Sequence, residues 1–218
     1  MDFSVIANNI SFMLGGLALT FQLALLTMAG GLALGIILAL GRLSSSPWFY
    51  YPASAYVHFF RGLPLILVIF WLYFLSPVIT GASMDEFAAA VISFILFEAA
   101  YFAEIIRAGI QSISKGQVMA ALAGGLTPFQ AARHVVLPQA LRNMTPAIVT
   151  QAVVIFQDTS LAYVIGLREF LRRVNLVDAR EARSVELYLF AGLVYFIICS
   201  IGSLWSQRLE NRRQRIWA

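Results

Sequence analysis

The residues Met-Ala-Ala-Leu-Ala-Gly-Gly-Leu-Thr-Pro at positions 119–128 decide how this chain is organised. Together with Val-Val-Leu-Pro at 135–138, they form a long interruption, flanked by polar residues, in an otherwise apolar polypeptide. The alanines favour a short helix. The paired glycines Gly124 and Gly125 supply the left-handed residue that ends such a helix. We therefore predict one short helix that stops at this glycine pair.

A second short helix is predicted directly after the first. Thr127 at the N-cap, Pro128 at the first helical position and Gln130 three residues after the cap form a capping box. Pro138 is expected to mark the next boundary. The result is a compact, self-capped helical pair of the kind that a partner protein grips.

The composition of the whole chain requires a bilayer. Of its 218 residues, 60% are hydrophobic and only 12% are charged. The mean hydropathy of +0.80 exceeds what one soluble domain could hide. The start, residues 1–4, has no basic region of the kind that precedes a cleaved signal, so we expect the first apolar segment to stay as a helix. The single Cys199 excludes an internal disulfide and is most simply a packing residue.

Five membrane-spanning helices are predicted, and the fold class is therefore all-α integral membrane. The apolar runs are each long enough for about 20 spanning residues. Gly31 and Gly35 in the first span form a small-xxx-small pair that lets another helix approach closely. We expect one domain, residues 1–218, with a loop over about 109–145 and the termini on opposite sides. The spans are predicted at about 11–40, 53–75, 86–108, 146–167 and 186–207.

The basic residues predict the orientation of the chain. Those that follow the first span, surround the central loop or form the tail belong to one side, which the positive-inside rule makes cytoplasmic. The N-terminus is then outside and the C-terminus inside. The segment 168–185 would be external, as a charged loop with a short helix. Either it is a solvated connector or it touches an external protein. The cytoplasmic set is Arg42, Lys115, Arg133, Arg142, Arg208, Arg212, Arg213 and Arg215.

Ionisable residues inside the spans are candidate functional positions, because a charge at membrane depth is costly. Glu98 lies about 18 Å from the external end of the third span, near the midplane. Two interpretations stay open for it, a place on a translocation path or a buried hydrogen-bonded position. Glu104 and Arg107 are expected to neutralise each other near the cytoplasmic end.

The fourth span carries the densest polar group. Four consecutive polar residues midway along a span cannot all face lipid, because each unpaired polar group there costs several kcal/mol. We expect some of them to line a wet cavity or to face another subunit. Asp158 is either part of such a path or a cap at a helix break. The group consists of Gln151, Gln157, Asp158, Thr159 and Ser160.

Several catalytic patterns are absent from the sequence. It has no phosphate-binding loop, so any ATP must be hydrolysed by another subunit. It has no nucleophile elbow, and His58 and His134 are far apart, so no catalytic residue, metal or cofactor is predicted. The pI near 9.5 comes mostly from the cytoplasmic arginines, which gives nucleic-acid binding little support.

The central interruption resembles the EAA loop of type I ABC importer permeases. Their pattern is Glu-Ala-Ala, three residues, Gly, nine residues, Ile, any residue, Leu-Pro. Met119 stands where the pattern has Glu, and Val135 stands where it has Ile. The flanking blocks 104–117, 137–140 and 156–161 resemble polar amino-acid permeases, closest to the glutamate/aspartate members. The matching positions are Ala120, Ala121, Gly125, Leu137 and Pro138.

This resemblance implies an ABC importer permease subunit that moves polar amino acids into the cytoplasm of a bacterium. Because the nearest match is to the glutamate/aspartate members, it implies glutamate and aspartate as the substrates. It implies a second permease subunit, two cytoplasmic ATP-binding subunits that dock on the loop, and an extracytoplasmic solute-binding protein. The block at 157–160 would lie near the gate. Glu98 and Asp158 would repel a dicarboxylate, so a compensating cation is needed, for which Arg61 is a candidate.

Two alternatives from other classes remain open at this point. A proton-coupled secondary transporter would also explain Glu98 and Asp158, although such folds usually show paired internal repeats, and none is evident here. A non-transporting membrane scaffold would explain the packing glycines alone.

Overall fold

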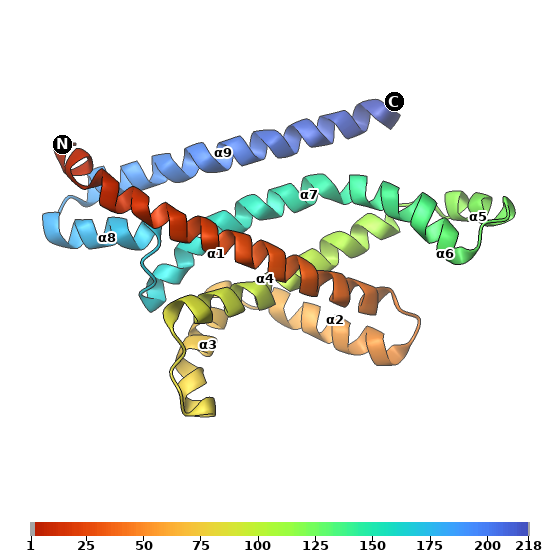
Figure 1. Ribbon diagram of the computed structural model, residues 1–218, viewed down its shortest axis with the longest axis horizontal. Helices are drawn as coiled ribbons and strands as arrows, with labels where there is room; N and C mark the ends of the chain where they lie inside the picture. Colours follow the sequence, from red (N-terminus) through yellow and green to blue (C-terminus); the bar gives the residue numbers. More distant parts are fainter. Residues whose placement is uncertain (1–2, 218) are drawn as a thin grey trace.

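The computed structural model describes residues 3–217, and their side chains over 3–211. All the regular structure in these residues is helical, which confirms the predicted fold class (Figure 1). In chain order the elements are α1 (Ser4–Leu43), α2 (Pro47–Arg61), α3 (Leu65–Thr80), α4 (Glu86–Gln111), α5 (Lys115–Ala123), α6 (Pro128–Ala131), the π-helix η1 (Ala132–Val136), α7 (Leu137–Asp158), the 3₁₀-helix η2 (Thr159–Ile165), α8 (Phe170–Glu181) and α9 (Ser184–Trp217).

Four helical stretches are long and apolar enough to cross a membrane. They cover Ser4–Leu43, Glu86–Gln111, Pro128–Ile165 and Ser184–Asn211. The first, third and fifth predicted spans therefore lie inside observed helices. The observed helices extend beyond the predicted ends, except that the third begins at the predicted residue 86. A fifth crossing is present if the bent pair α2 and α3 counts as one span.

The second predicted span, 53–75, is not one continuous helix but falls across the break between α2 and α3. The chain bends by 101° between α2 and α3. Pro64 disfavours helical geometry at the residue before it and lacks an N–H to continue the helix. Gly62 caps α2 by donating its N–H to the carbonyls of His58 and Phe59, each at 3.1 Å. A hydropathy pattern does not register such a break, because the apolar residues continue across it.

The boundary predicted at Pro138 was also wrong. The helix that begins at Pro128 does not stop there but widens into η1 and continues as α7. The N–H of Leu137 donates to the carbonyl of Ala132, five residues back, which is π-helical spacing. Pro138 lies directly after η1, where the spacing returns from π-helical to α-helical. The fourth span consequently begins well before the predicted residue 146.

The centre of the molecule is the crossing of α1 and α4 (Figure 1). A Cβ atom on Gly31 would lie 3.2 Å from the Cβ of Glu98, and one on Gly35 would lie 2.6 Å from the Cβ of Phe102. These distances leave no room for side chains. The predicted role of Gly31 and Gly35 in close helix packing is confirmed.

The charged segment 168–185 contains the predicted short helix, α8, but it is a packed element rather than a solvated connector. Phe170, Val174 and Val177 are fully buried against α1 and α9. The N–H of Phe170 donates to Oγ1 of Thr20 on α1 at 3.2 Å. Glu169 is fully buried at the N-cap of α8, where its carboxylate accepts the N–H groups of the first turn.

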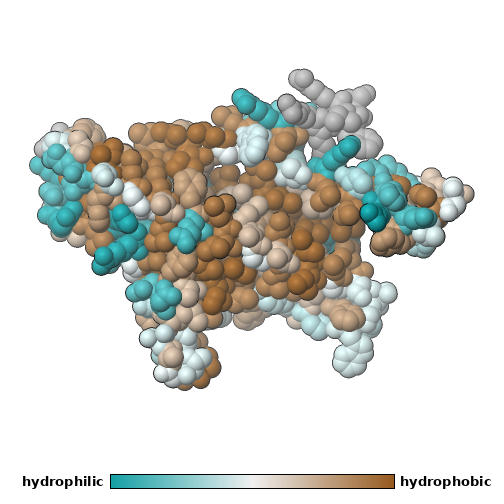
Figure 2. Space-filling view, viewed as in Figure 1, coloured by the Kyte–Doolittle hydropathy of each residue, from teal (hydrophilic) through white to brown (hydrophobic). Residues whose placement is uncertain are grey.

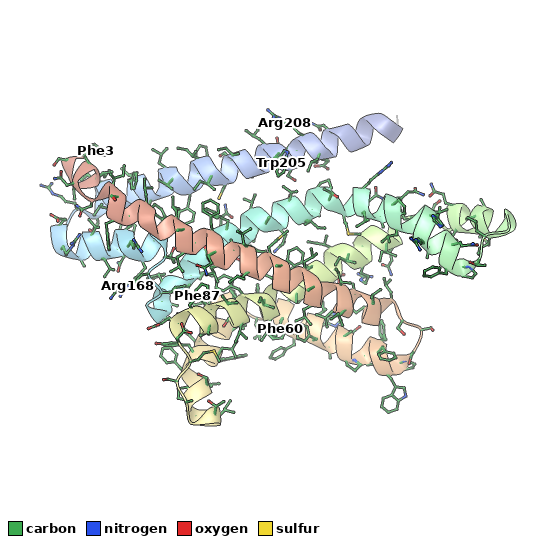
Figure 3. The ribbon with its side chains drawn as sticks, in the orientation of Figure 1. Phe3, Phe60, Phe87, Arg168, Trp205 and Arg208 are labelled. Carbon is green, nitrogen blue, oxygen red and sulfur yellow. The ribbon has the colours of Figure 1, made fainter. Side chains whose placement is uncertain are left out.

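The two ends of the molecule carry different groups of elements. Figure 1 places the N-terminus and α8 at one end, and the C-terminus, the α1–α2 turn and the α5–α6 pair at the other. Figure 2 shows an apolar band between these ends and hydrophilic residues gathered at both. In Figure 3, Phe3 and Arg168 lie toward the α8 end, whereas Arg208 lies beyond the middle of α9. The predicted cytoplasmic residues Arg212, Arg213 and Arg215 lie outside the described side chains.

Candidate functional site

The α5 helix projects from the bundle without burying any of its residues. Met119 is 70% exposed and Leu122 is 42% exposed, although both are apolar. Ala120 is exposed and Ala121 is half-buried on the same short helix. An exposed apolar surface at the hydrophilic end of the molecule is the kind of surface that a partner protein covers.

The turn after α5 is a Schellman motif. The N–H of Leu126 donates to the carbonyl of Ala121 at 3.1 Å, and the N–H of Gly125 donates to that of Leu122 at 3.0 Å. Gly125 has a φ of +88°, so it is the left-handed residue, and its neighbour Gly124 has an ordinary φ of −74°. The predicted helix stop is confirmed at one of the two glycines.

The predicted capping box is also confirmed. Oγ1 of Thr127 accepts the N–H of Gln130 at 3.3 Å, and Oε1 of Gln130 accepts the N–H of Thr127 at 2.9 Å. The α5–α6 connector, residues 112–131, thus takes its shape from its own hydrogen bonds. Leu137 and Pro138 lie beyond it, exposed at the start of α7.

A polar pocket of about 390 Å³ lies between the end of α2, the second half of α4 and α7. Its lining includes charged and amide side chains as well as small and apolar residues. Its volume suits a small ligand. The lining residues are Arg61, Tyr101, Glu104, Ile105, Ala108, Gly109, Ser112, Asn143, Met144, Ala147 and Gln151.

Glu104 is the centre of a charge cluster at this pocket. Its carboxylate pairs with Arg107, as predicted, and also with Arg42 at the end of α1. Nη1 of Arg61 lies 3.9 Å from Oε2 of the same carboxylate. Sequence reasoning missed Arg42 and placed Arg61 only as a candidate cation. The sequence feature that could have pointed to both is that each is an arginine at the end of an apolar run.

Glu98 and Gln151 are brought together by α4 and α7. Nε2 of Gln151 donates to Oε2 of Glu98 at 2.7 Å. Glu98 is fully buried, and its Oε1 has no partner within the described part of the chain. Gln151 lines the polar pocket, whereas Glu98 lies behind it. Glu98 is therefore buried and hydrogen-bonded, and its place on a translocation path stays a prediction.

The polar block 157–160 lies where α7 changes into the 3₁₀-helix η2, rather than midway along a span. Gln157 is exposed, Asp158 and Ser160 are partly buried, and Thr159 is fully buried. Oγ1 of Thr159 donates to the carbonyl of Phe156 at 2.6 Å. The side chain of Asp158 makes no capping hydrogen bond to η2. None of these four residues lines the polar pocket.

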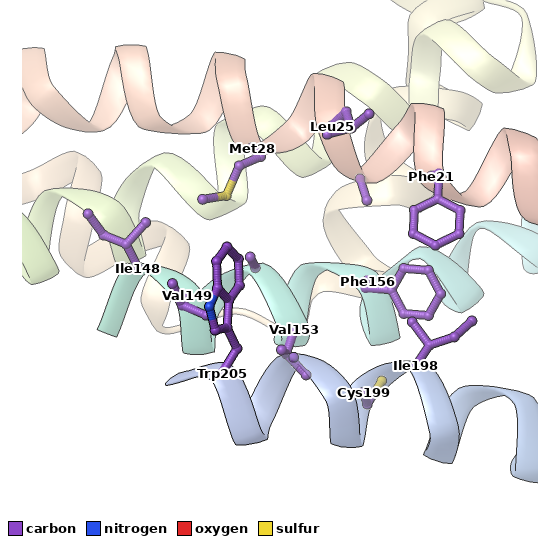
Figure 4. Close-up of a pocket in the computed structure, with 13 residues that line it drawn as sticks. Phe21, Leu25, Met28, Ile148, Val149, Val153, Phe156, Ile198, Cys199 and Trp205 are labelled. Atoms are coloured by element: carbon purple, nitrogen blue, oxygen red, sulfur yellow. The ribbon is translucent and has the colours of Figure 1, made fainter. Parts of the chain in front are cut away.

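A second pocket, of about 380 Å³, lies on the other side of α7 and is almost entirely apolar. Figure 4 shows Phe21, Leu25 and Met28 of α1 opposite Val153 of α7 and Trp205 of α9. It offers hardly any group that could bind the charges of an amino acid. Across the described residues, no cluster of three or more His, Cys, Asp or Glu side chains is placed to hold a metal ion.

Comparison with known proteins identifies what this architecture is similar to. Residues 31–216 match the family described as "Binding-protein-dependent transport system inner membrane component". The chain is 42% identical over 218 residues to the glutamate/aspartate import permease protein GltK of Escherichia coli O6:H1, covering 97% of each chain. It is 37% identical over 212 residues to the arginine transport system permease protein ArtQ of Bacillus subtilis, again covering 97% of each.

Solved structures agree with these relatives. A crystal structure of an amino acid ABC transporter with histidines superposes with a TM-score of 0.92 at 30% identity, covering 97% of this chain and 99% of that one. An inward-facing structure of the MetNI methionine ABC transporter gives a TM-score of 0.66 at 22% identity, covering 89% of this chain and 92% of that one. At that identity the second match concerns the fold alone.

Proposed function

The chain belongs to the family of binding-protein-dependent transport system inner membrane components, as a permease of amino-acid ABC importers, and we propose that it carries glutamate and aspartate into the cell. The substrate class is supported by the similarity to a glutamate/aspartate import permease. It is also supported by the excess of arginine over acidic side chains around Glu104 at the polar pocket.

The partners in this proposal are a second permease subunit, two cytoplasmic ATP-binding subunits and an extracytoplasmic solute-binding protein. One observation supports α5 as the docking surface for an ATP-binding subunit: α5 buries none of its own residues and exposes Met119. Ala120 and Ala121 let two backbones approach closely, in a helix-in-groove contact. The same end of the molecule is then cytoplasmic, the N-terminus lies outside, and the bilayer is the bacterial inner membrane.

The connector is joined to α4 and α7, two of the three helices that line the polar pocket. Nδ2 of Asn143 on α7 donates to Oγ of Ser112 at the end of α4, at 2.8 Å. Nearby, a Cβ on Gly109 would lie 3.0 Å from the Cβ of Met144, so α4 and α7 are in close contact. A push on α5 during ATP-driven closure is therefore delivered to α4 and α7 together. Their movement opens the path to one side of the membrane or the other.

The remaining site residues have proposed places along that path. Gln151 lines the polar pocket, and Glu98 holds Gln151 in position. The block Gln157, Asp158, Thr159 and Ser160 lies at the external end of α7, where a helix changes its geometry. We assign this block to the gate.

The test of substrate and energy source is uptake of radiolabelled glutamate by cells that express the complete transporter. Excess aspartate should compete, whereas arginine and histidine should not. Uptake should stop on ATP depletion and survive collapse of the proton gradient. Competition by arginine but not by aspartate would reject the proposal of an acidic substrate. Dependence of uptake on the proton gradient would reject ATP as the energy source.

The test of docking is Ala121→Glu, which places a charge in a desolvated contact. We expect it to abolish substrate-stimulated ATP hydrolysis and to release the ATP-binding subunit during purification, while the spans stay inserted. Ala82→Glu is the matched control, because Ala82 is exposed in the α3–α4 turn, away from α5. Unaltered stimulation in the Ala121 variant would place the docking surface elsewhere.

A further inference from the structure

Arg61 is a charged residue at the broken point of a membrane segment. It is the last residue of α2, and the chain turns by 101° directly after it. Discontinuous helices are where transporters of other folds place their substrate and ion sites. A charged residue within a membrane segment is costly unless it serves a path or a partner. Its side chain is 43% exposed and lines the polar pocket.

The contacts of Arg61 leave its charge largely uncompensated. Its guanidinium lies over the ring of Tyr101, 5.6 Å from the centroid, and 3.9 Å from Oε2 of Glu104. Both oxygens of Glu104 are already engaged, one by Arg42 and the other by Arg107. Three guanidinium groups thus share one carboxylate, and Arg61 is the one of the three that lines the pocket.

The other polar side chains that line the pocket are uncharged. Gln151 gives its amide N–H to Glu98, so the amide carbonyl is the atom left to accept a hydrogen bond from an ammonium group. Ser112 and Asn143 are hydrogen-bonded to each other at the rim. The only acidic side chain that lines the pocket is Glu104, among residues 3–211. A ligand with a net negative charge matches this distribution better than a neutral one.

We propose that Arg61 binds the side-chain carboxylate of an acidic amino acid and thereby makes this pocket prefer acidic over neutral amino acids. The proposal rests on the proposed function. An arginine fork can bind a carboxylate through two parallel hydrogen bonds. Glutamine has the same shape as glutamate but leaves the guanidinium without an anion. Glutamate and glutamine share the α-carboxylate and the α-ammonium groups, so these groups cannot account for a difference in affinity between the two ligands.

The experiment measures binding and uptake by the complete transporter, co-purified with its partner subunits and reconstituted in lipid vesicles. Arg61→Gln removes the charge, and Arg61→Lys keeps the charge but removes the planar fork. Arg142→Gln is the matched control, because Arg142 is an exposed arginine of α7 beside Asn143 that does not line the pocket. Radiolabelled glutamate and glutamine are compared in each variant, with co-purification of the ATP-binding subunit as the measure of assembly.

Arg61→Gln should weaken glutamate binding by about tenfold or more, the size of a charge-assisted hydrogen bond, and change glutamine binding by less than about twofold. Arg61→Lys should give an intermediate loss, and Arg142→Gln should bind like the wild type. Equal losses for both ligands, or no loss, in an assembled Arg61→Gln complex would overturn the proposal. A wild-type complex that transports neither ligand would instead reject the proposed function.

If Arg61→Gln fails to assemble, Arg61→Lys decides the question. A lysine fills the position and keeps the positive charge near Glu104, so assembly is expected. A lower ratio of glutamate to glutamine affinity in that variant supports the carboxylate contact. A ratio equal to that of the wild type overturns it.

Discussion

Two polar connectors lie at opposite ends of the molecule and are held by opposite means (Figure 1). The α5–α6 connector buries no residue of α5 and takes its shape from hydrogen bonds at Ser114 and Thr127. The α8 helix buries Phe170, Val174 and Val177 against α1 and α9. One connector is shaped locally, and the other is part of the core.

This difference shows that a connector can have a well-defined conformation without being packed against the membrane spans. Caps and a Schellman turn define the α5–α6 connector without fixing it against the spans, so its exposed surface stays available to another protein. Packing at α8 joins that helix to α1, so the two move together. We expect substitutions in α8 to change stability and substitutions in α5–α6 to change coupling.

The largest effect is expected for Gly16→Ala. A Cβ on Gly16 would lie 2.7 Å from the Cα and 2.8 Å from the backbone N of Phe170, and a backbone contact cannot rotate away. Overpacking of this kind costs about 3 kcal/mol. The thermal unfolding midpoint of the purified protein should fall by several degrees.

Gly116→Ala is the matched substitution in the other connector. No atom lies within 4 Å of a Cβ on Gly116, and alanine favours the helix by about 0.5 to 1 kcal/mol. Its unfolding midpoint should stay unchanged or rise slightly. Similar losses of stability in both variants would contradict the distinction between the connectors.

A second, smaller effect should appear as a pH dependence at α8. Burial raises the pKa of the Glu169 carboxyl from 4.5 to about 7, against the hydrogen bonds from the N–H groups of Leu171 and Arg172. The folded state therefore holds the proton more tightly than the unfolded state. The stability from this group is present below about pH 4.5 and is lost as the pH rises through about 7. Between pH 5 and pH 8 the expected loss is about 2 to 3 kcal/mol.

Glu169→Gln should flatten this part of the pH profile, because a glutamine keeps an oxygen for the cap but does not titrate. Glu181→Gln, at the exposed end of the same helix, should leave the profile as in the wild type. Thermal unfolding at pH 5 and pH 8 measures both. A wild-type midpoint that rises between these two values would show that the sign is wrong.

The local features of both connectors could be predicted from sequence because they depend on near neighbours. The capping box and the left-handed Gly125 involve residues within five positions of each other. The packing of α8 could not be predicted, because Thr20 and Phe170 are 150 residues apart. The break at Gly62 and Pro64 was missed, because apolar residues on both sides concealed it.

The same limit applies to the candidate site. The pair Glu104 and Arg107 was predicted, because the two residues are three positions apart on one helix. Arg42 reaches the same carboxylate from 62 residues away, and Arg61 reaches it from another helix. Gln151 and Glu98 were each predicted as polar positions, but their hydrogen bond depends on how α4 and α7 pack. A cluster of charged residues from distant parts of the chain can be predicted only when the fold is known.

Gly125→Ala should, like Gly116→Ala, have little effect on stability. It tests whether the backbone conformation at this turn matters when no side-chain contact is involved. Gly125 has a φ of +88°, and no atom lies within 4 Å of a Cβ there, so only the backbone opposes a side chain. The cost is about 1 to 2 kcal/mol and falls on the turn that aims α5. Since α5 buries nothing, the unfolding midpoint of the whole protein should scarcely move.

Coupling is where this variant should differ from the wild type. In the reconstituted transporter, Gly125→Ala should reduce substrate-stimulated ATP hydrolysis, because α5 is presented at the wrong angle to its partner. Gly124→Ala is the matched control, since Gly124 has an ordinary φ of −74° and a Cβ there would meet its nearest atoms at 3.4 Å, an ordinary contact. Equal stimulation in both variants would mean that the left-handed turn does not aim the helix, and that α5 is positioned by the partner that holds it.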